Sequence, residues 1–354
     1  MRSRLVAAWC GVAAAGSLAC APTASTGSLP VEVLVVLDST TRTLTLIPTD
    51  STRVITTLPI EIPDAAPTSL AVRGSLAIVG LAGPDPIAAL VFDLSSRTLK
   101  RLVTFAPGSV ASVAFGDDGI GYAAVPDAGR VLRFDPTGSA VQELSVTGGP
   151  QAFGVMRGRV FAINGNRAGC APGACAGFAS WLTTVTNGAR DSIPLVGPGN
   201  AASAAAGPDG FLYVLNTGDG APVEGRLSVV DPVRGTETAS FGGFGPAPRF
   251  VAADGGSRVL VASATGGLMA FDIRERRVER GFGLGIPLGA PSGLAADALG
   301  RAYVLERGSC TAQAPGRVRV FGADLIERPA LTGGICPIGV GIAEIPAEVL
   351  GVAP

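Results

Sequence analysis

The chain has 354 residues, nearly half of them hydrophobic, together with 50 glycines and 27 prolines. This mixture favours many short strands joined by tight turns, because glycine and proline interrupt strands and destabilise helix interiors. The net charge is −1 and no basic run occurs, so we expect no nucleic-acid binding. The chain has no histidine, which excludes Ser-His-Asp and Cys-His catalysis and histidine metal sites.

The first 19 residues have the features of an export signal. Arg2 and Arg4 precede a short apolar stretch, and small residues directly precede Cys20. The stretch is too short to span a membrane. The ending Ser17-Leu18-Ala19-Cys20 resembles the lipobox of bacterial lipoproteins, with Ser17 where leucine is usual. The alternative is a plain secretory signal in which Cys20 is incidental.

The lipobox resemblance implies a durable membrane anchor. Cys20 would carry several acyl chains and become the new N-terminus. Residues 20–30 would then form a flexible tether. Ala21 rather than aspartate follows the cysteine, which by resemblance to the enteric sorting rule favours the outer membrane, on its periplasmic or surface side.

A unit of two apolar strands separated by a polar loop recurs seven times. The first strand of each pair aligns at spacings of 39 to 52 residues, on Leu34, Leu76, Gly121, Val160, Leu212, Val259 and Ala302. Such periods suit propeller blades or helical repeats, and the short alternating runs with turn signals between them favour strands. Each unit is interpreted as four antiparallel strands A to D: Ser292–Asp297, Ala302–Glu306, Val318–Phe321 and about Leu325–Leu331 in the last unit.

The two ends of the repeat complete one another. The first unit lacks strand A, whereas Cys336–Ile342 resembles a strand A with no strand B after it. The C-terminal strand is therefore expected to close the ring by completing the first blade, which removes exposed sheet edges. We predict an all-β, seven-bladed propeller over residues 31–346, followed by a tail at 347–354.

The repeat resembles the NHL and YncE-like propellers. Their repeats carry a strand like Leu212-Tyr213-Val214 followed by one like Val229-Val230 with a terminal aspartate, here Asp231. The resemblance covers about Val31 to Ile345 and implies the fold. It implies little about function.

Loop length distinguishes the two faces of the predicted ring. Both termini are expected on the bottom face, with the A–B and C–D turns, whereas the D–A and B–C loops lie on top. The longest B–C loops are Asn166–Phe178, Thr217–Gly225 and Arg307–Gly316, and long loops commonly carry binding sites, although neutral insertion is the alternative.

The four cysteines that follow Cys20 also fall in loops of the top face. An exported chain with an even number of them favours disulfides, and we predict the pairs Cys170–Cys175 and Cys310–Cys336. A redox or metal site is the alternative. The first pair encloses four residues rather than two, and without histidine a zinc site would need all four cysteines.

Two rings of aligned positions are candidates for a ligand site. Gluconolactonase-type propellers hold a metal with carboxylates and amides near the top of strand A. None of the residues aligned with that site is a carboxylate, so we expect no such metal site: Thr68, Ala111, Gln151, Ala202, Arg249, Ser292 and Ile338. The ends of strand B carry Asp38, Gly80, Val125, Asn164, Asn216, Ser263 and Glu306. This second ring could hold calcium, or each side chain could bond its own turn, which is the favoured interpretation.

Two classes of function follow from these positions. The favoured one is a non-catalytic, lipid-anchored, monomeric propeller, without cofactor or metal, that binds a protein or glycan through its top loops. The alternative is a histidine-free hydrolase or lyase with a polar site at the top centre. Possible ligand-binding residues are Arg249, Gln151, Asp38, Asn164, Asn216 and Glu306. Arg249 could bind an anion or pair with Glu306 or Asp38.

Overall fold

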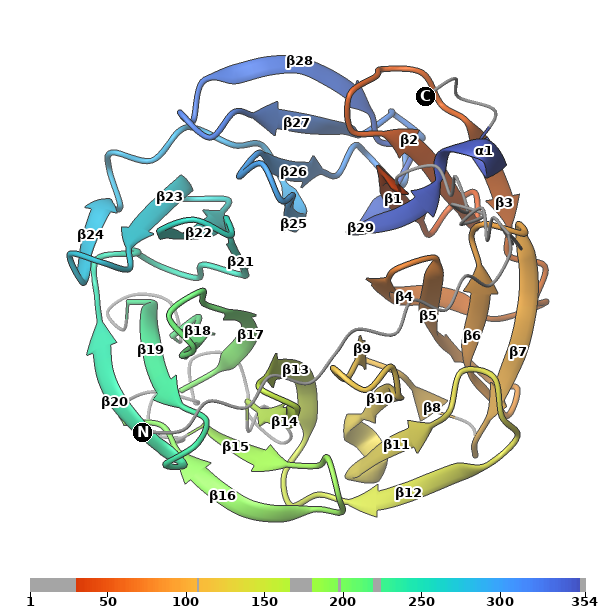
Figure 1. The fold of residues 1–354 in the computed structure, drawn as a ribbon, viewed down its shortest axis with the longest axis horizontal. Helices are drawn as coiled ribbons and strands as arrows, with labels where there is room; N and C mark the ends of the chain where they lie inside the picture. The colour runs from red at the N-terminus through yellow and green to blue at the C-terminus, as the bar shows by residue number, and fades with distance from the viewer. Residues whose placement is uncertain (1–29, 107, 166–179, 197–198, 219–223, 351–354) are drawn as a thin grey trace, which may run out of the picture.

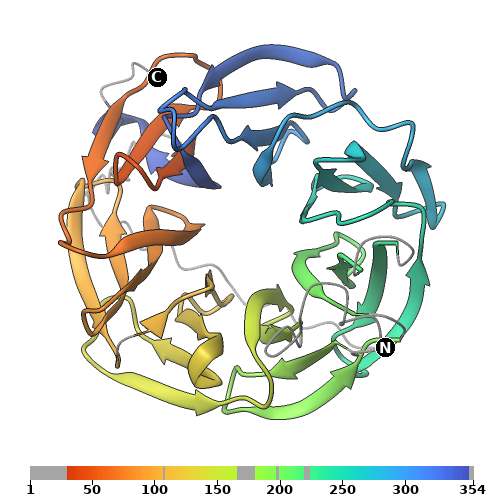
Figure 2. The same ribbon diagram turned by 180° about the vertical axis from the view of Figure 1, so that it is seen from behind.

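A computed structural model describes residues 30–106, 108–165, 180–196, 199–218 and 224–350. Seven antiparallel sheets stand around a central axis as the blades of a propeller, with their innermost strands facing the centre (Figures 1 and 2). This confirms the predicted fold class. Within these ranges no helix is long and apolar enough to cross a membrane.

The blades follow one another in chain order, each running from the innermost strand A to the outermost strand D. Blades 2 to 4 comprise β4 (Ala66–Arg73), β5 (Leu76–Gly83), β6 (Ile87–Asp93) and β7 (Thr98–Thr104); β9 (Ser112–Phe115), β10 (Gly121–Val125), β11 (Arg130–Phe134) and β12 (Val141–Ser145); and β13 (Pro150–Met156), β14 (Arg159–Asn164), β15 (Trp181–Thr184) and β16 (Arg190–Pro194).

Blades 5 to 7 repeat the arrangement. They comprise β17 (Ala201–Ala206), β18 (Leu212–Asn216), β19 (Arg226–Asp231) and β20 (Thr236–Phe241); β21 (Phe250–Ala253), β22 (Arg258–Ser263), β23 (Gly267–Asp272) and β24 (Arg277–Arg280); and β25 (Pro291–Ala296), β26 (Ala302–Glu306), β27 (Arg317–Phe321) and β28 (Glu327–Thr332). Three short elements complete the described chain: β8 (Gly108–Ser109), which pairs with β5, the 3₁₀ helix η1 (Pro126–Ala128) and the helix α1 (Ala347–Leu350).

Blade 1 is built from both ends of the chain. Its strands are β29 (Pro337–Pro346), β1 (Pro30–Asp38), β2 (Thr43–Pro48) and β3 (Thr56–Pro59). β29 pairs antiparallel with β1 from Pro30↔Pro346 to Asp38↔Pro337, so the C-terminal strand closes the ring as predicted. Because Pro30 and Pro346 lie at the same end of this pair, both ends of the described strands emerge at the face that carries the A–B turns.

The apolar core is divided among the spaces between blades. The alternation of β1 shows why: Val33, Val35 and Leu37 pack toward blade 2, whereas Leu34 and Val36 pack toward blade 7. A corresponding cluster lies between each of the remaining pairs of neighbouring blades. Strand B is therefore buried on both faces, which explains its continuous apolar sequence.

Arginines link neighbouring blades at the bottom face. Arg159 and Arg301 donate to the carbonyl oxygens of Pro232 and Thr49 in the C–D turn of the next blade, at 2.8 and 3.0 Å. Arg258 does the same to Ala323. A planar guanidinium with several donors suits such bridging, so these three arginines help to hold neighbouring blades together.

Strand boundaries in blade 7 differ from the sequence prediction, and strands A and C begin one residue earlier than expected, at Pro291 and Arg317. Strand D of blade 7 begins at Glu327 rather than near Leu325. Leu325 adopts a left-handed backbone conformation with φ of 59°, and its side chain is buried in the core between blades 6 and 7. The leucine is therefore a turn residue with an apolar anchor, and a hydrophobic pattern alone counts it as strand.

Candidate functional site

Asp38, at the top end of β1, holds the seam at which the ring closes. One carboxylate oxygen accepts hydrogen bonds from the backbone N–H groups of Thr40 and Thr41, both at 2.8 Å. The other accepts from Ile335 and Cys336 at 2.5 and 3.0 Å, at the start of the closing strand. The side chain is 1% exposed. All four bonds are to backbone, so Asp38 fastens the closing strand to the first blade.

Glu306 occupies the equivalent position in blade 7 and is likewise saturated. It accepts hydrogen bonds from Gly289 N at 2.7 Å, Arg317 Nε at 2.8 Å and Arg319 Nη1 at 3.3 Å. Burial opposes ionisation of this carboxyl, but these donors outweigh it and hold the pKa of Glu306 below its usual value. Arg319 also pairs with Glu327 at 2.7 Å, so the charges form a network within one blade.

The polar side chains at the equivalent position of blades 4, 5 and 6 form hydrogen bonds within their own hairpins. Asn164 Nδ2 donates to Thr183 Oγ1 at 3.1 Å, and Asn216 Nδ2 donates to Ser228 Oγ at 2.9 Å. Ser263 Oγ accepts from two N–H groups of its own turn. Among the described residues, the Oδ1 atoms of Asn164 and Asn216 are buried without a hydrogen-bond partner.

Hydroxyl groups of strand A connect successive blades at the top centre. Thr68 Oγ1 donates to Val110 O at 2.6 Å, and Ser292 Oγ donates to Pro337 O at 2.7 Å. The Ser203 hydroxyl donates to the carbonyl oxygen of Arg249, whose guanidinium lies 5.9 Å from the centre of the Phe250 ring. The inner ring of polar residues therefore contributes bonds between blades.

The other predicted residue of this ring is Gln151, on β13. Its side chain is half-buried and lies beside Gly165, at the end of β14. The predicted ligand-binding residues thus surround the top of the ring on several blades. In the described part of the chain, no three acidic or cysteine side chains gather as a metal site would require.

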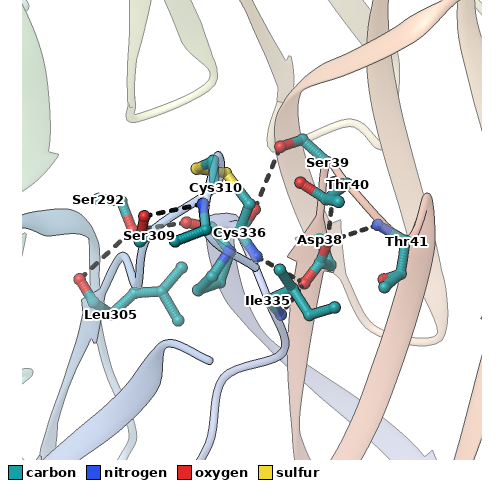
Figure 3. The surroundings of a disulfide bond; sticks show 12 residues. Asp38, Ser39, Thr40, Thr41, Ser292, Leu305, Ser309, Cys310, Ile335 and Cys336 are labelled. Atoms are coloured by element: carbon teal, nitrogen blue, oxygen red, sulfur yellow. Dashed lines mark hydrogen bonds between the residues drawn. A yellow bond between two sulfur atoms is a disulfide. The ribbon is translucent and has the colours of Figure 1, made fainter. Parts of the chain in front are cut away.

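A disulfide joins Cys310 to Cys336, as predicted, with the Cα atoms 4.9 Å apart. It links the B–C loop of blade 7 to the start of β29, beside Asp38 and Ile335 (Figure 3). Ser39 adds two hydrogen bonds to the carbonyl oxygen of Cys336. The predicted pair Cys170–Cys175 and the predicted lipidation site Cys20 lie outside the described residues.

The loop that carries Cys310 is held by backbone hydrogen bonds as well as by the disulfide. Ser309 and Ala314 exchange two backbone hydrogen bonds at 3.1 and 3.0 Å inside it. Residues 311–315 are nevertheless exposed on the top face. The loop is thus a defined projection.

The sequence analysis missed a cavity at the bottom of the ring. It measures about 720 Å³ and is lined by the ends of strand A and the A–B turns of blades 7, 1, 2 and 3: Glu32, Arg73, Gly74, Ser75, Leu76, Phe115, Gly119, Ala296, Asp297, Ala298, Ile342 and Glu344. Aligning the A–B turns, as was done for the top ends of the strands, would have brought these residues together.

The charged walls of this cavity are partly engaged by the fold. Glu32 Oε1 accepts a hydrogen bond from Ala298 N at 3.1 Å. Asp297 forms an ion pair with Arg301 and accepts a hydrogen bond from the Tyr303 hydroxyl. Arg73 donates to the carbonyl oxygen of Asp117 in blade 3. The mouth therefore carries more acidic than basic groups, with most of them serving contacts between turns.

The fold defines the chain as a seven-bladed β-propeller with four-stranded blades. It is similar to apo AztD from Citrobacter koseri, with 12% identity and a TM-score of 0.53 over 89% of this chain and 99% of that one. It is also similar to a quinonprotein alcohol dehydrogenase-like protein from Bacteroides thetaiotaomicron, with 10% identity and a TM-score of 0.60 over 87% and 77% of the two chains. At these identities the similarity concerns the fold alone. No protein-family model and no curated protein sequence matches the chain.

Proposed function

We propose that the chain is an exported binding module that recognises a protein or glycan partner through the loops of its top face. The observation that carries this proposal is the loop around Cys310. A loop held by a disulfide and by the Ser309–Ala314 backbone pair, yet exposed at residues 311–315, loses little conformational freedom when a partner binds. Preorganised projections of this kind are suited to recognition.

The polar residues beneath the loop support binding rather than chemistry. Asp38 and Glu306 are fully used by backbone and arginine donors, so they act as fasteners of loops. A general base or nucleophile needs a reactive group that can reach a substrate. The hydrolase or lyase alternative would need such a group, and the bonds of these two carboxylates do not favour it.

We further propose that lipid on Cys20 anchors the module to the outer membrane. The lipobox-like Ser17-Leu18-Ala19-Cys20 and the Ala21 that follows support this placement. The tether would leave from the bottom face, because β1 starts there, and the top face would point away from the bilayer.

Site-specific photocrosslinking in intact cells tests the binding face. A photoreactive amino acid at Gln313 samples the exposed loop of blade 7, and the same group at Ser139 samples an exposed C–D turn on the bottom face. The proposal predicts a discrete crosslinked partner from Gln313 that is absent from Ser139. The same products from both positions, or none from Gln313 and from other top-face positions, would overturn it.

The anchor is tested separately. Mass spectrometry of the mature protein should show diacylation of Cys20, and Cys20→Ser should move the protein from the membrane to the soluble fraction. A wild-type protein that begins elsewhere, or that is soluble without detergent, would contradict the anchor without affecting the binding face.

A further inference from the structure

Two aliphatic side chains project from the bottom end of blade 7. Leu299, in the A–B turn, is 69% exposed and Ile326, in the C–D turn, is 59% exposed. Ala298 and Ala323 are exposed beside them. A Cβ on Gly300 would lie in van der Waals contact with Ala323, so the two turns touch. They form one apolar projection, which we call the blade 7 tip.

Comparison of the blades shows that the turn does not need Leu299. In the A–B turns of blades 3 and 5 the aligned residues are Asp118 and Asp209, whose carboxylates accept the N–H of Ile120 and Phe211. In blade 7 this role passes to Asp297, which accepts from Leu299 N at 3.0 Å and Arg301 N at 2.8 Å. The side chain of Leu299 therefore makes no hydrogen bond in the turn and is exposed.

Two carboxylates beside the blade 7 tip are paired with arginines, and a third, that of Glu32, accepts a hydrogen bond from Ala298 N. Asp324 pairs with Arg328 at 3.0 Å, and Asp297 pairs with Arg301. These ion pairs lie beside the aliphatic side chains and compensate one another. Leu299 and Ile326 can therefore meet an apolar surface without burying the charge of Asp297 or Asp324 unpaired.

The blade 7 tip lies next to the start of the first strand. Ala298 N donates to Glu32 Oε1, two residues from Pro30, where β1 begins. Pro30 lies ten positions after Cys20 in the chain. A segment of this length spans at most about 35 Å when extended and about 17 Å on average as a random coil. An anchor on Cys20 would therefore keep the blade 7 tip close to the bilayer.

We propose that Leu299 and Ile326 insert into the interfacial region of the membrane and hold the ring with its top face directed outward. This inference rests on the proposed lipidation of Cys20, which supplies a high local concentration of bilayer. Two side chains are too few for a stable protein interface, which needs about 800 Å² on each partner. A weak apolar contact next to a tether is sufficient to orient a domain on a lipid surface.

Tryptophan quenching by brominated lipids measures the contact. The full mature lipoprotein is reconstituted in phosphatidylethanolamine–phosphatidylglycerol vesicles that contain brominated acyl chains. Leu299→Trp reports on the blade 7 tip, Gln313→Trp reports on the top of the same blade, and the unsubstituted protein gives the signal of Trp181. A fourth protein combines Leu299→Trp with Ile326→Ser, and thermal unfolding verifies that every variant is folded.

The proposal predicts strong quenching of Leu299→Trp and none of Gln313→Trp. Loss of the Ile326 side chain should lower the ratio of docked to undocked protein by about tenfold or more, as the transfer of one large aliphatic group implies. Equal quenching at positions 299 and 313, or quenching at 299 that Ile326→Ser leaves unchanged, would overturn it.

The lipid itself is controlled independently. If mass spectrometry finds no lipid on Cys20, the protein is coupled through Cys20 to a maleimide lipid in the same vesicles. Quenching that is restored by this coupling would support the blade 7 tip while refuting the native anchor. A coupled protein that shows no quenching at position 299 would refute the docking surface.

Discussion

Replacing Asp38 by asparagine tests whether the closing strand is held by this one side chain. The amide keeps a single oxygen, so it can satisfy either the turn donors Thr40 and Thr41 or the seam donors Ile335 and Cys336, but not both pairs. Two backbone N–H groups then face an NH₂ donor in a buried site. At about 1.5 kcal/mol for each hydrogen bond to a charged group, the loss is about 3 kcal/mol.

The expected change in the midpoint temperature of thermal unfolding follows from the size of the domain. Unfolding entropy of about 2.1 cal/mol/K per residue gives about 0.6 kcal/mol/K for roughly 300 residues, so 3 kcal/mol corresponds to about 5 °C. Differential scanning calorimetry under non-reducing conditions measures this shift. Buffer, pH and scan rate are kept the same for all variants.

Asp231→Asn is the matched control. Asp231 accepts N–H bonds from Val233 and Arg234 through one oxygen, within its own turn, and no bond to another blade is found for it among the described residues. Asparagine preserves those bonds, so we expect a loss below about 1 kcal/mol. Equal midpoints for Asp38→Asn and Asp231→Asn would refute the role of Asp38 at the seam.

Three further predictions concern stability. Replacing Cys310 and Cys336 by serine opens a loop of 26 residues and should lower the free energy of unfolding by about 3.5 kcal/mol, a difference from wild type that vanishes in reductant. Burial opposes ionisation of Asp93, but bonds from Ser95 and Lys100 outweigh it and lower its pKa to about 2. The stability that the ionised Asp93 contributes is therefore present above pH 4 and lost toward pH 2. In urea titrations across that range, wild type should lose its advantage over Asp93→Asn as the pH falls. Burial and the Asp297 carboxylate raise the pKa of Tyr303, so wild type should lose stability above pH 10, and Tyr303→Phe should lose less in alkaline unfolding curves.

The repeat made the fold predictable because burial imposes the same pattern on every blade. Strand B is covered on both faces, so runs such as Leu212–Leu215 are apolar without interruption and align from blade to blade. The missing strand A of the first unit and the extra one at Pro337–Pro346 then required closure. Leu325 shows the limit, since an apolar residue in a left-handed turn has the same letter as one in a strand.

The candidate site was predictable in position but only partly in role. Alignment correctly placed Asp38 and Glu306 at strand ends. It could not show that the seam brings Ile335 and Cys336 to Asp38 across nearly 300 residues, or that Arg317 and Arg319 converge on Glu306. Those bonds depend on the path of the D–A loops and on side-chain orientation, which a linear pattern does not contain.

Because blade 1 combines strands from both ends of the chain, it can form completely only when the last strand has been synthesised. The inner strand of this blade is synthesised almost 300 residues after its neighbour, and Asp38 meets Ile335 at a separation of 297. A product that stops before Pro337 leaves the inner edge of β1 unpaired, and such an edge is open to aggregation and proteolysis. Premature termination or incomplete translocation would therefore leave β1, the first strand of the chain, without its inner partner.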